Sequence, residues 1–192
     1  MTGDLGAGRS EVHAQAGEVL RFWFEETPAD KHFAKDEALD AEIRSRFAKV
    51  RDAVLADGAL GWRETPDHLL AAIILLDQFS RNLHRGDAAA FAADPLALEL
   101  TRHAIAMEWE ESYPPEGRAF LYLPLMHSED SEVQELSLDR YEHLGITENL
   151  QFARAHADVI ATYGRFPSRN EALGRTSTPA EQEYLSQPGA GW

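Results

Sequence analysis

Apolar residues recur along most of the chain with the spacing of an α-helix. Ile43, Phe47 and Val54 are separated by four and seven residues, which places them on one helical face. The segment 69–79 is apolar almost all the way round, as is typical of a helix in the centre of a protein. No convincing alternation of apolar and polar positions predicts a strand. The pattern therefore predicts an all-α protein built from antiparallel helix pairs packed in series.

Capping residues and prolines divide this pattern into separate helices. Thr65, Asp94 and Thr178 each precede a proline, which predicts a side-chain cap followed by proline at the first helical position, where its missing N–H costs nothing. Pro124 predicts a kink or an end within its helix. The expected helices are residues 10–25, 36–57, 65–84, 95–108, 115–127, 131–144, 147–163 and 179–186.

Length and composition fit one domain in an intracellular protein. A chain of 192 residues with 44% hydrophobic residues can form one sizeable core but has little room for two. We expect a flexible N-terminus at residues 1–9 and a single helical domain at residues 10–192. The chain has no cysteine, which excludes disulfides and thiolate sites, and its N-terminus lacks the apolar run of a signal peptide. These features favour a cytoplasmic location.

Acidic residues dominate the charge and are concentrated in the middle of the chain. The net charge is −15, and residues 108–148 contain eleven Asp and Glu against two Arg. Such a surface repels phosphodiester backbones and anionic lipids, so we expect neither nucleic acid nor a membrane as a partner. No stretch reaches the roughly 20 apolar residues of a membrane span. The acidic segment is interpreted as a solvated face, with a cationic ligand as the alternative.

Five polar residues occur at the end of the most apolar helix. Asp77, Arg81 and Arg85 follow one another at intervals of four, and Gln78 and Asn82 lie one step round the helix. An unpaired buried charge is costly, so these side chains need partners. The structural interpretation is an Asp77–Arg81 pair, with Arg and Asn side chains binding carbonyls at helix ends. The functional interpretation is an arginine fork that binds a carboxylate or phosphate.

A second Arg-Asn pair repeats this composition near the C-terminus. Phe79-Ser80-Arg81-Asn82 is echoed by Phe166-Pro167-Ser168-Arg169-Asn170, and each follows an apolar helix. Together with Arg165, this second motif supplies further candidate ligand-binding residues, Arg169 and Asn170. One echo is too little for a repeat array, which needs about three units.

A third polar motif supplies candidates for catalysis. His127, Glu129 and Asp130 end one helix and begin the next, and a carboxylate beside a histidine is a possible general base. With His156, His127 and Glu129 also suggest a zinc or iron site, although no HExxH motif supports it and a histidine on an apolar face is more often a structural residue. Ser80, Ser128 and Ser168 are the available nucleophiles, and none lies in a G-x-S-x-G motif.

Four stretches carry a resemblance to a known family. They are VLRFWF (19–24), LLDQFSRNLHRG (75–86), FLYLPLMHSED (120–130) and GRFPSRN (164–170), and they resemble the bacterial "domain of unknown function 924" family. The likeness runs in order from about Gly17 to Trp192. It implies a helical fold like that of tetratricopeptide-repeat proteins and no known reaction. Ser168 stands where such sequences typically have a histidine, so any role for an imidazole there does not carry over.

Three functions stay open on the sequence alone. The first is a pocket for a small anionic ligand, formed by the three polar motifs, in an enzyme or a binding protein. The second is a tetratricopeptide-like scaffold that binds a peptide or protein, with those motifs purely structural. The third is a metal-dependent hydrolase. The sequence specifies no cofactor and no oligomeric state. Phe33 and the aromatic run 22–24 are interpreted as core, although adjacent aromatic residues cannot all face one way, so one is a candidate for a groove or subunit contact.

Overall fold

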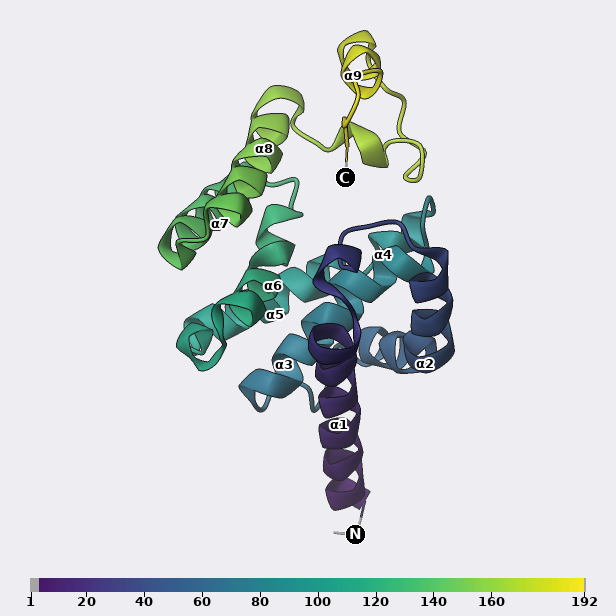
Figure 1. Cartoon of the computed structure of the whole chain (residues 1–192), viewed down its shortest axis with the longest axis vertical. Helices are drawn as coiled ribbons and strands as arrows, with labels where there is room; N and C mark the ends of the chain where they lie inside the picture. Colours follow the sequence, from purple (N-terminus) through teal and green to yellow (C-terminus); the bar gives the residue numbers. More distant parts are fainter. Residues whose placement is uncertain (1–3, 192) are drawn as a thin grey trace.

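The structure, a computed structural model, describes residues 4–191, which form helices joined by turns and loops (Figure 1). No strand occurs among these residues, so the predicted all-α class is confirmed. Of the segment 1–9 that was expected to be flexible, residues 1–3 lie outside the described residues. No helix between residues 4 and 191 has both the length and the apolar character that a membrane span needs.

The observed helices follow the predicted ones closely. Helices α7 and α8 have the predicted bounds, whereas α1 begins earlier than residue 10. Helix α6 continues past Pro124. The α-helices are α1 (Asp4–Arg21), α2 (Glu37–Ala56), α3 (Pro66–Ile73), α4 (Ser80–Leu83), α5 (Asp94–Ala106), α6 (Pro115–Met126), α7 (Ser131–Leu144), α8 (Thr147–Tyr163) and α9 (Pro179–Leu185).

Two π-helical segments interrupt the regular helices. One, Phe22–Glu26, prolongs α1, and the other, Ile74–Phe79, joins α3 to α4. A π-helical turn contains an extra residue and rotates the side chains that follow, and such turns are frequent at functional sites. The second segment carries Asp77 and Gln78, both of which are buried. The predicted helix 65–84 is therefore present, with a π-helical segment at the position of its polar motif.

The caps explain where several helices begin. Thr178 accepts a hydrogen bond from the backbone N–H of Glu181, whose side chain accepts one from the N–H of Thr178, so the predicted capping box is confirmed. Thr65 caps α3 as predicted. The predicted Asp94 cap is wrong: Asp94 is the first residue of α5, Ala93 precedes it as the cap, and the Asp94 side chain binds two arginines instead.

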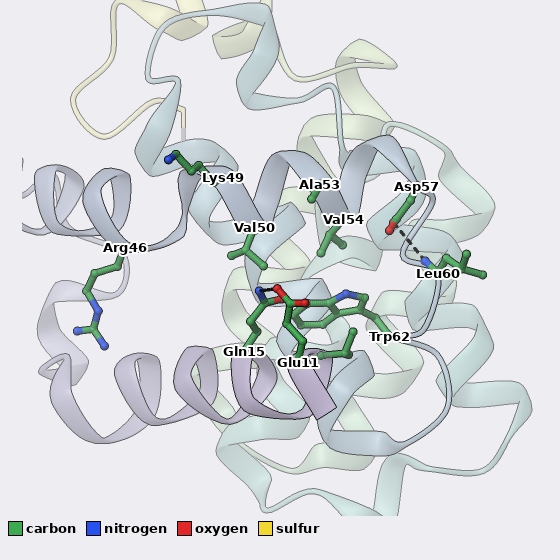
Figure 2. Close-up of a pocket in the computed structure, with 11 residues that line it drawn as sticks. Glu11, Gln15, Arg46, Lys49, Val50, Ala53, Val54, Asp57, Leu60 and Trp62 are labelled. Atoms are coloured by element: carbon green, nitrogen blue, oxygen red, sulfur yellow. Dashed lines mark hydrogen bonds between the residues drawn. The ribbon is translucent and has the colours of Figure 1, made fainter. Parts of the chain in front are cut away.

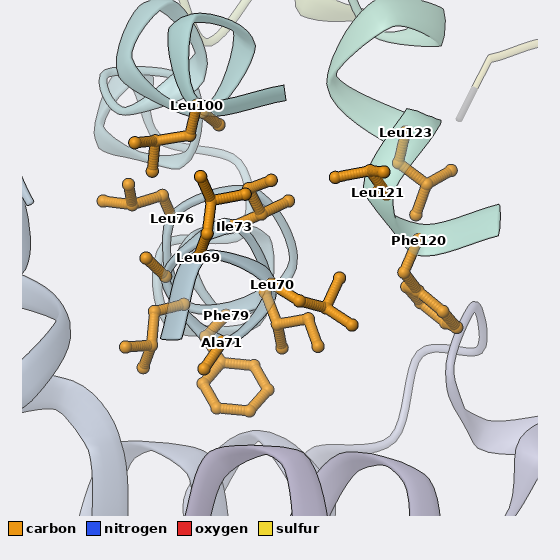
Figure 3. Close-up of a cluster of buried hydrophobic side chains, with 14 of the residues drawn as sticks. Leu69, Leu70, Ala71, Ile73, Leu76, Phe79, Leu100, Phe120, Leu121 and Leu123 are labelled. Atoms are coloured by element: carbon orange, nitrogen blue, oxygen red, sulfur yellow. The ribbon is translucent and has the colours of Figure 1, made fainter. Parts of the chain in front are cut away.

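The core surrounds α3 and the π-helical segment that follows it. Every residue from Leu69 to Leu76 is buried, which confirms that this segment is central. Side chains of α5 and α6, among them Leu100 and Leu121, close over it (Figure 3). Each such leucine or isoleucine contributes roughly 1.5–3 kcal/mol by its burial. This apolar core fixes the position of Asp77, which lies within the same segment.

The remaining helices are arranged around this core. Helix α1 packs against α3, α2 packs against α4, and α6, α7 and α8 pack one against the next (Figure 1). Beyond α8, a smaller apolar cluster of Val159, Ile160 and Phe166, with Tyr163 and Tyr184 against it, holds the C-terminal segment that carries α9. This order of packed helices is a helical array. Its finer likeness to tetratricopeptide repeats stays a prediction.

Candidate functional site

A buried carboxylate is hydrogen-bonded to a histidine at the centre of the predicted polar cluster. Asp77 is completely buried, and its Oδ1 lies 2.7 Å from Nδ1 of His127, the residue that follows α6. Its Oδ2 accepts a hydrogen bond from Nε2 of Gln78 at 2.6 Å. Nη1 of Arg81 lies 3.2 Å from Oδ1, so the predicted Asp77–Arg81 pair is present. The carboxylate therefore has three side-chain partners.

These contacts determine where the protons lie on the Asp77–His127 pair. Burial alone raises the pKa of Asp77, but the Arg81 cation and the His127 hydrogen bond outweigh it and hold this pKa well below its usual range. An ionised carboxylate only accepts hydrogen bonds, so Nδ1 of His127 must donate. Burial lowers the pKa of His127, which keeps the imidazole neutral at neutral pH. Its Nε2 is therefore an unprotonated acceptor.

The Nε2 atom of His127 is available to a ligand. The imidazole keeps 13% of its surface exposed, and none of its hydrogen bonds to residues 4–191 involves Nε2. A neutral histidine that is oriented by a carboxylate and has a vacant Nε2 is the arrangement that general-base catalysis requires. The pair can thus accept a proton from a bound molecule.

Two arginines beside this pair share a second carboxylate. Arg81 donates from Nη1 and Nη2 to the two oxygens of Asp94, both at 3.1 Å, and Nη1 of Arg169 donates to the same carboxylate at 3.3 Å. Arg169 also donates to the backbone carbonyl of His127 at 2.9 Å. The three separate motifs of the sequence thus meet at Arg81, His127 and Arg169.

Asp94 balances the charge of the cluster. At its centre the guanidiniums of Arg81 and Arg169 lie against two carboxylates, Asp77 and Asp94. Burial, aided by the Arg81 cation, nevertheless lowers the pKa of Arg169 to about 10. The faces of Phe91 and Phe166 lie 4.8 and 4.5 Å from this guanidinium and limit its contact with water. Arg169 is therefore a partly desolvated cation beside His127.

The other residues of the first motif bind elsewhere. Asn82 donates to Asp40 of α2 at 2.8 Å, and Arg85 donates to both oxygens of the same carboxylate at 2.5 and 2.9 Å. All three residues are engaged in this one contact, which joins α2 to α4. Predicted as ligand-binding residues, Asn82 and Arg85 are thus placed as ties between helices.

The second motif repeats this arrangement. Arg165 donates to both oxygens of Glu181 at 2.7 and 2.9 Å, and Asn170 donates to the same carboxylate at 3.4 Å. Each Arg-Asn motif therefore sends one arginine to Asp94, while its asparagine shares another carboxylate with a neighbouring arginine. The echo in the sequence corresponds to a repeated contact, and Arg165 and Asn170 hold the C-terminal segment together.

The carboxylates of the third motif are occupied by structural contacts. Glu129 accepts two hydrogen bonds from Arg175, at 2.7 and 2.9 Å, and one from the backbone N–H of Phe166 at 2.8 Å. Asp130 caps α7 through the N–H groups of Glu132 and Val133. Of the predicted catalytic candidates, His127 therefore has the chemistry of a base with a vacant acceptor.

The candidate metal ligands His127, Glu129 and His156 are engaged in other contacts. Nδ1 of His156 is 2.8 Å from the carbonyl of Phe152, and the His156 ring lies 6.0 Å from that of His127. Glu129 binds Arg175, as described above. Within the described part of the chain, no three His, Asp or Glu side chains are placed to hold a metal ion. Burial lowers the pKa of His156 to about 3, as expected of a structural core histidine.

Two depressions in the surface are lined by residues outside this cluster. One, of about 420 Å³, lies between α1 and α2 beside Trp62, and its lining includes both Glu11 and Lys49 (Figure 2). The other, of about 570 Å³, lies between the segment after α1 and the start of α6. Neither is lined by Arg81, His127 or Arg169.

Several residues of the site could not be identified from the sequence. Asp94 was taken for a cap because it precedes a proline, and Phe91 belongs to no motif. Arg175 lies beyond the second motif and carried no signal of its pairing with Glu129. In each case the partner is distant along the chain: Asp94 and Arg169 are 75 residues apart. Only the fold brings them together.

Comparisons with known proteins agree with the fold. Residues 19–189 match the family described as "Bacterial protein of unknown function (DUF924)". The solved structure of the protein of unknown function ATU0120 from Agrobacterium tumefaciens is similar, with a TM-score of 0.86 and 37% sequence identity over 91% of this chain and 98% of that chain. No curated protein matches this one. The predicted resemblance is thus confirmed, and the chain belongs to the bacterial DUF924 family of proteins of unknown function.

Proposed function

We propose that this protein is a cytoplasmic acid–base catalyst for a small anionic substrate, with the Asp77–His127 pair as its centre. The observation that carries the proposal is the vacant Nε2 of a neutral histidine whose Nδ1 is bound by a fully buried carboxylate. A purely structural histidine has no need of such an orientation, since a contact to a carbonyl satisfies Nδ1, as at His156.

Each residue has a role in this proposal. Nε2 of His127 takes a proton from the substrate, and the ionised Asp77 stabilises the imidazolium that forms, as in other carboxylate–histidine pairs. Arg169 binds the anionic group, because it is a partly desolvated cation beside His127 and a guanidinium matches the geometry of a carboxylate or phosphate. Arg81 keeps Asp77 ionised and holds Asp94 in place.

The alternative is a tetratricopeptide-like scaffold that binds a peptide or protein, in which the same cluster is structural. The two hydrogen bonds from Arg81 to Asp94 support it, because they leave few of its donors for a ligand. A ligand titration separates the two functions, since only the catalytic proposal requires an anion to bind beside His127.

The test is a titration with inorganic phosphate and with succinate, followed by the NMR signals of the His127 side chain. We expect saturable shifts in the wild type and at least a tenfold weaker affinity in Arg169→Gln, as the loss of a charge-assisted hydrogen bond of about 1.5–3 kcal/mol implies. Arg165→Gln is the matched control, since Arg165 also binds a carboxylate and a backbone carbonyl but lies outside the cluster. It should bind like the wild type.

The outcomes decide between the two functions. If both anions leave the His127 signals unchanged in the folded wild type, the catalytic proposal is wrong and the scaffold replaces it. The same conclusion follows if Arg169→Gln, with an unchanged far-UV circular dichroism spectrum, binds as tightly as the wild type.

A further inference from the structure

We propose that the depression between the segment after α1 and the start of α6 binds a small organic cation with an apolar body. This depression of about 570 Å³, here called the aromatic groove, is lined by Phe33, Phe120, His32, Glu116, Asn149 and other, mostly apolar residues. It is independent of the His127 cluster, and nothing in the proposed function uses it.

Two parallel aromatic rings form one wall of the groove. Phe120 projects from α6 toward the segment after α1 (Figure 3), and the Phe33 ring stacks on it with centroids 5.7 Å apart and an angle of 6° between the ring planes. Phe33 is 71% exposed although it is a large apolar residue. An exposed phenylalanine supported by a buried one offers its outer face to a ligand, and aromatic faces attract cations.

Two polar side chains of the groove, Glu116 and His32, present hydrogen-bond acceptors. Glu116 carries the one formal charge among its described lining residues, and its carboxylate has no hydrogen bond or ion pair to residues 4–191. His32 donates from Nε2 to the carbonyl of Trp23 at 2.8 Å, and burial lowers its pKa, so Nδ1 is an acceptor. Lys31, adjacent in sequence, is neutralised by Asp36 at 2.6 Å.

Charge and size together define the ligand class. The α6 wall of the groove belongs to the acidic segment 108–148, which contains eleven Asp and Glu residues and two Arg residues. A cation is therefore attracted and an anion repelled. The volume lies within the range of about 300–1,000 Å³ that is usual for small-molecule sites. An ammonium group bound between Glu116 and the face of Phe33, with an aromatic or aliphatic body against Leu123, fits this charge and shape.

Glu116 also has a structural explanation, which a matched control can separate. An acidic residue in the first turn of a helix interacts favourably with the helix dipole. Glu132 occupies the first turn of α7 in the same way but does not line the groove. Glu116→Gln and Glu132→Gln should thus have similar effects on stability, and only Glu116→Gln should affect binding.

The experiment is isothermal titration calorimetry of the whole chain with 2-phenylethylammonium chloride. We expect saturable binding with one site, and about three- to fivefold weaker affinity for Phe33→Leu, as expected from loss of a cation–π contact at an exposed site. Phe152→Leu is the control for Phe33, since Phe152 is 48% exposed and lies on α8 outside the groove. The anion 3-phenylpropanoate, of similar shape, should show no saturable binding.

Every result bears on the proposal. Weaker binding in Phe33→Leu and Glu116→Gln, with unchanged binding in Phe152→Leu and Glu132→Gln, supports it. Absence of saturable binding by the ammonium overturns it, as does equal binding of 3-phenylpropanoate or equal affinity in all four variants. Sedimentation velocity that shows a dimer broken by Phe33→Leu also overturns it, because the groove would then be covered by a second copy.

Discussion

Replacement of Asp94 by asparagine tests the central cluster most severely. This one carboxylate accepts three hydrogen bonds from two guanidiniums, and the side chains of Arg81, Asp94 and Arg169 are 22, 19 and 11% exposed. The substitution keeps the size of the side chain but removes the charge and one acceptor oxygen. Arg81 would retain only Asp77 as a counter-ion, and Arg169 would retain none within hydrogen-bonding distance.

The expected loss of stability follows from the burial of these charges. Removing one partner of a buried ion pair costs about 3–5 kcal/mol, and the partial exposure of the group places the expected loss near the lower limit, about 3 kcal/mol. Loss of the favourable interaction with the α5 dipole accounts for at most about 1 kcal/mol of it. Stability of an ordinary domain is roughly 5–15 kcal/mol, so the variant should fold but unfold at a much lower denaturant concentration.

The assay is urea unfolding, monitored by tryptophan fluorescence and far-UV circular dichroism. The control is Glu111→Gln, because Glu111 binds Arg118 through two nitrogens at 2.9 and 3.2 Å in similar geometry but is 83% exposed. Exposed pairs contribute about 1 kcal/mol or less, so the control should differ little from the wild type. If Asp94→Asn is destabilised no more than Glu111→Gln, with the same denaturant dependence, the charges are not held in a buried network and the reasoning is wrong.

Three further predictions concern the same residues. Arg81→Ala should lower the melting temperature by the equivalent of a few kcal/mol, because Asp77 would lose its counter-ion, and an unchanged or raised melting temperature would show that Arg81 is not a structural tie. Stability should fall between pH 7 and pH 5. Burial lowers the pKa of His156 in the folded protein to about 3, so below pH 6.5 the unfolded chain takes up a proton at this residue and the folded protein does not. Unfolding is therefore favoured as the pH falls, and at pH 5 the loss of stability from His156 is about 2 kcal/mol. The variant His156→Gln should show a smaller decrease in urea-derived stability between pH 7 and pH 5. Asp77→Asn should lower the pKa of His127 further, because the Asp77 charge and hydrogen bond raise it in the wild type; an NMR pH titration in which the His127 pKa rises would contradict this.

The sequence was a good guide to the fold because helix formation depends on local signals. The predicted bounds of α7 and α8 agree with the structure, and Gly145 ends α7 in a left-handed conformation with φ of 76°, which glycine adopts without strain. The buried position of residues 69–76 followed from their apolar character alone. The prediction was wrong at Asp94. The proline after this residue indicated a helix cap, but the Asp94 carboxylate instead accepts hydrogen bonds from Arg81 and Arg169.

The candidate site was predicted only in part because its geometry depends on contacts between distant segments. Pattern and spacing identified Asp77, Arg81, His127 and Arg169, which the fold brings together. They did not show that Asp77 orients His127, a contact across 50 residues that also depends on the π-helical segment. The aromatic groove was not foreseen. Phe33 was interpreted as a core residue, which is wrong because its side chain is 71% exposed, and the candidate for a groove was one of residues 22–24.

The protonation state of His127 tests the central claim most directly. Two-dimensional ¹⁵N NMR of the imidazole at pH 7 distinguishes the two neutral tautomers from the cation. The Asp77–His127 geometry predicts a neutral ring with its proton on Nδ1 and an unprotonated Nε2, whose signal shifts when phosphate or succinate is added. A ring that is charged at pH 7, or neutral with its proton on Nε2, would leave no base at this site and contradict the proposed function.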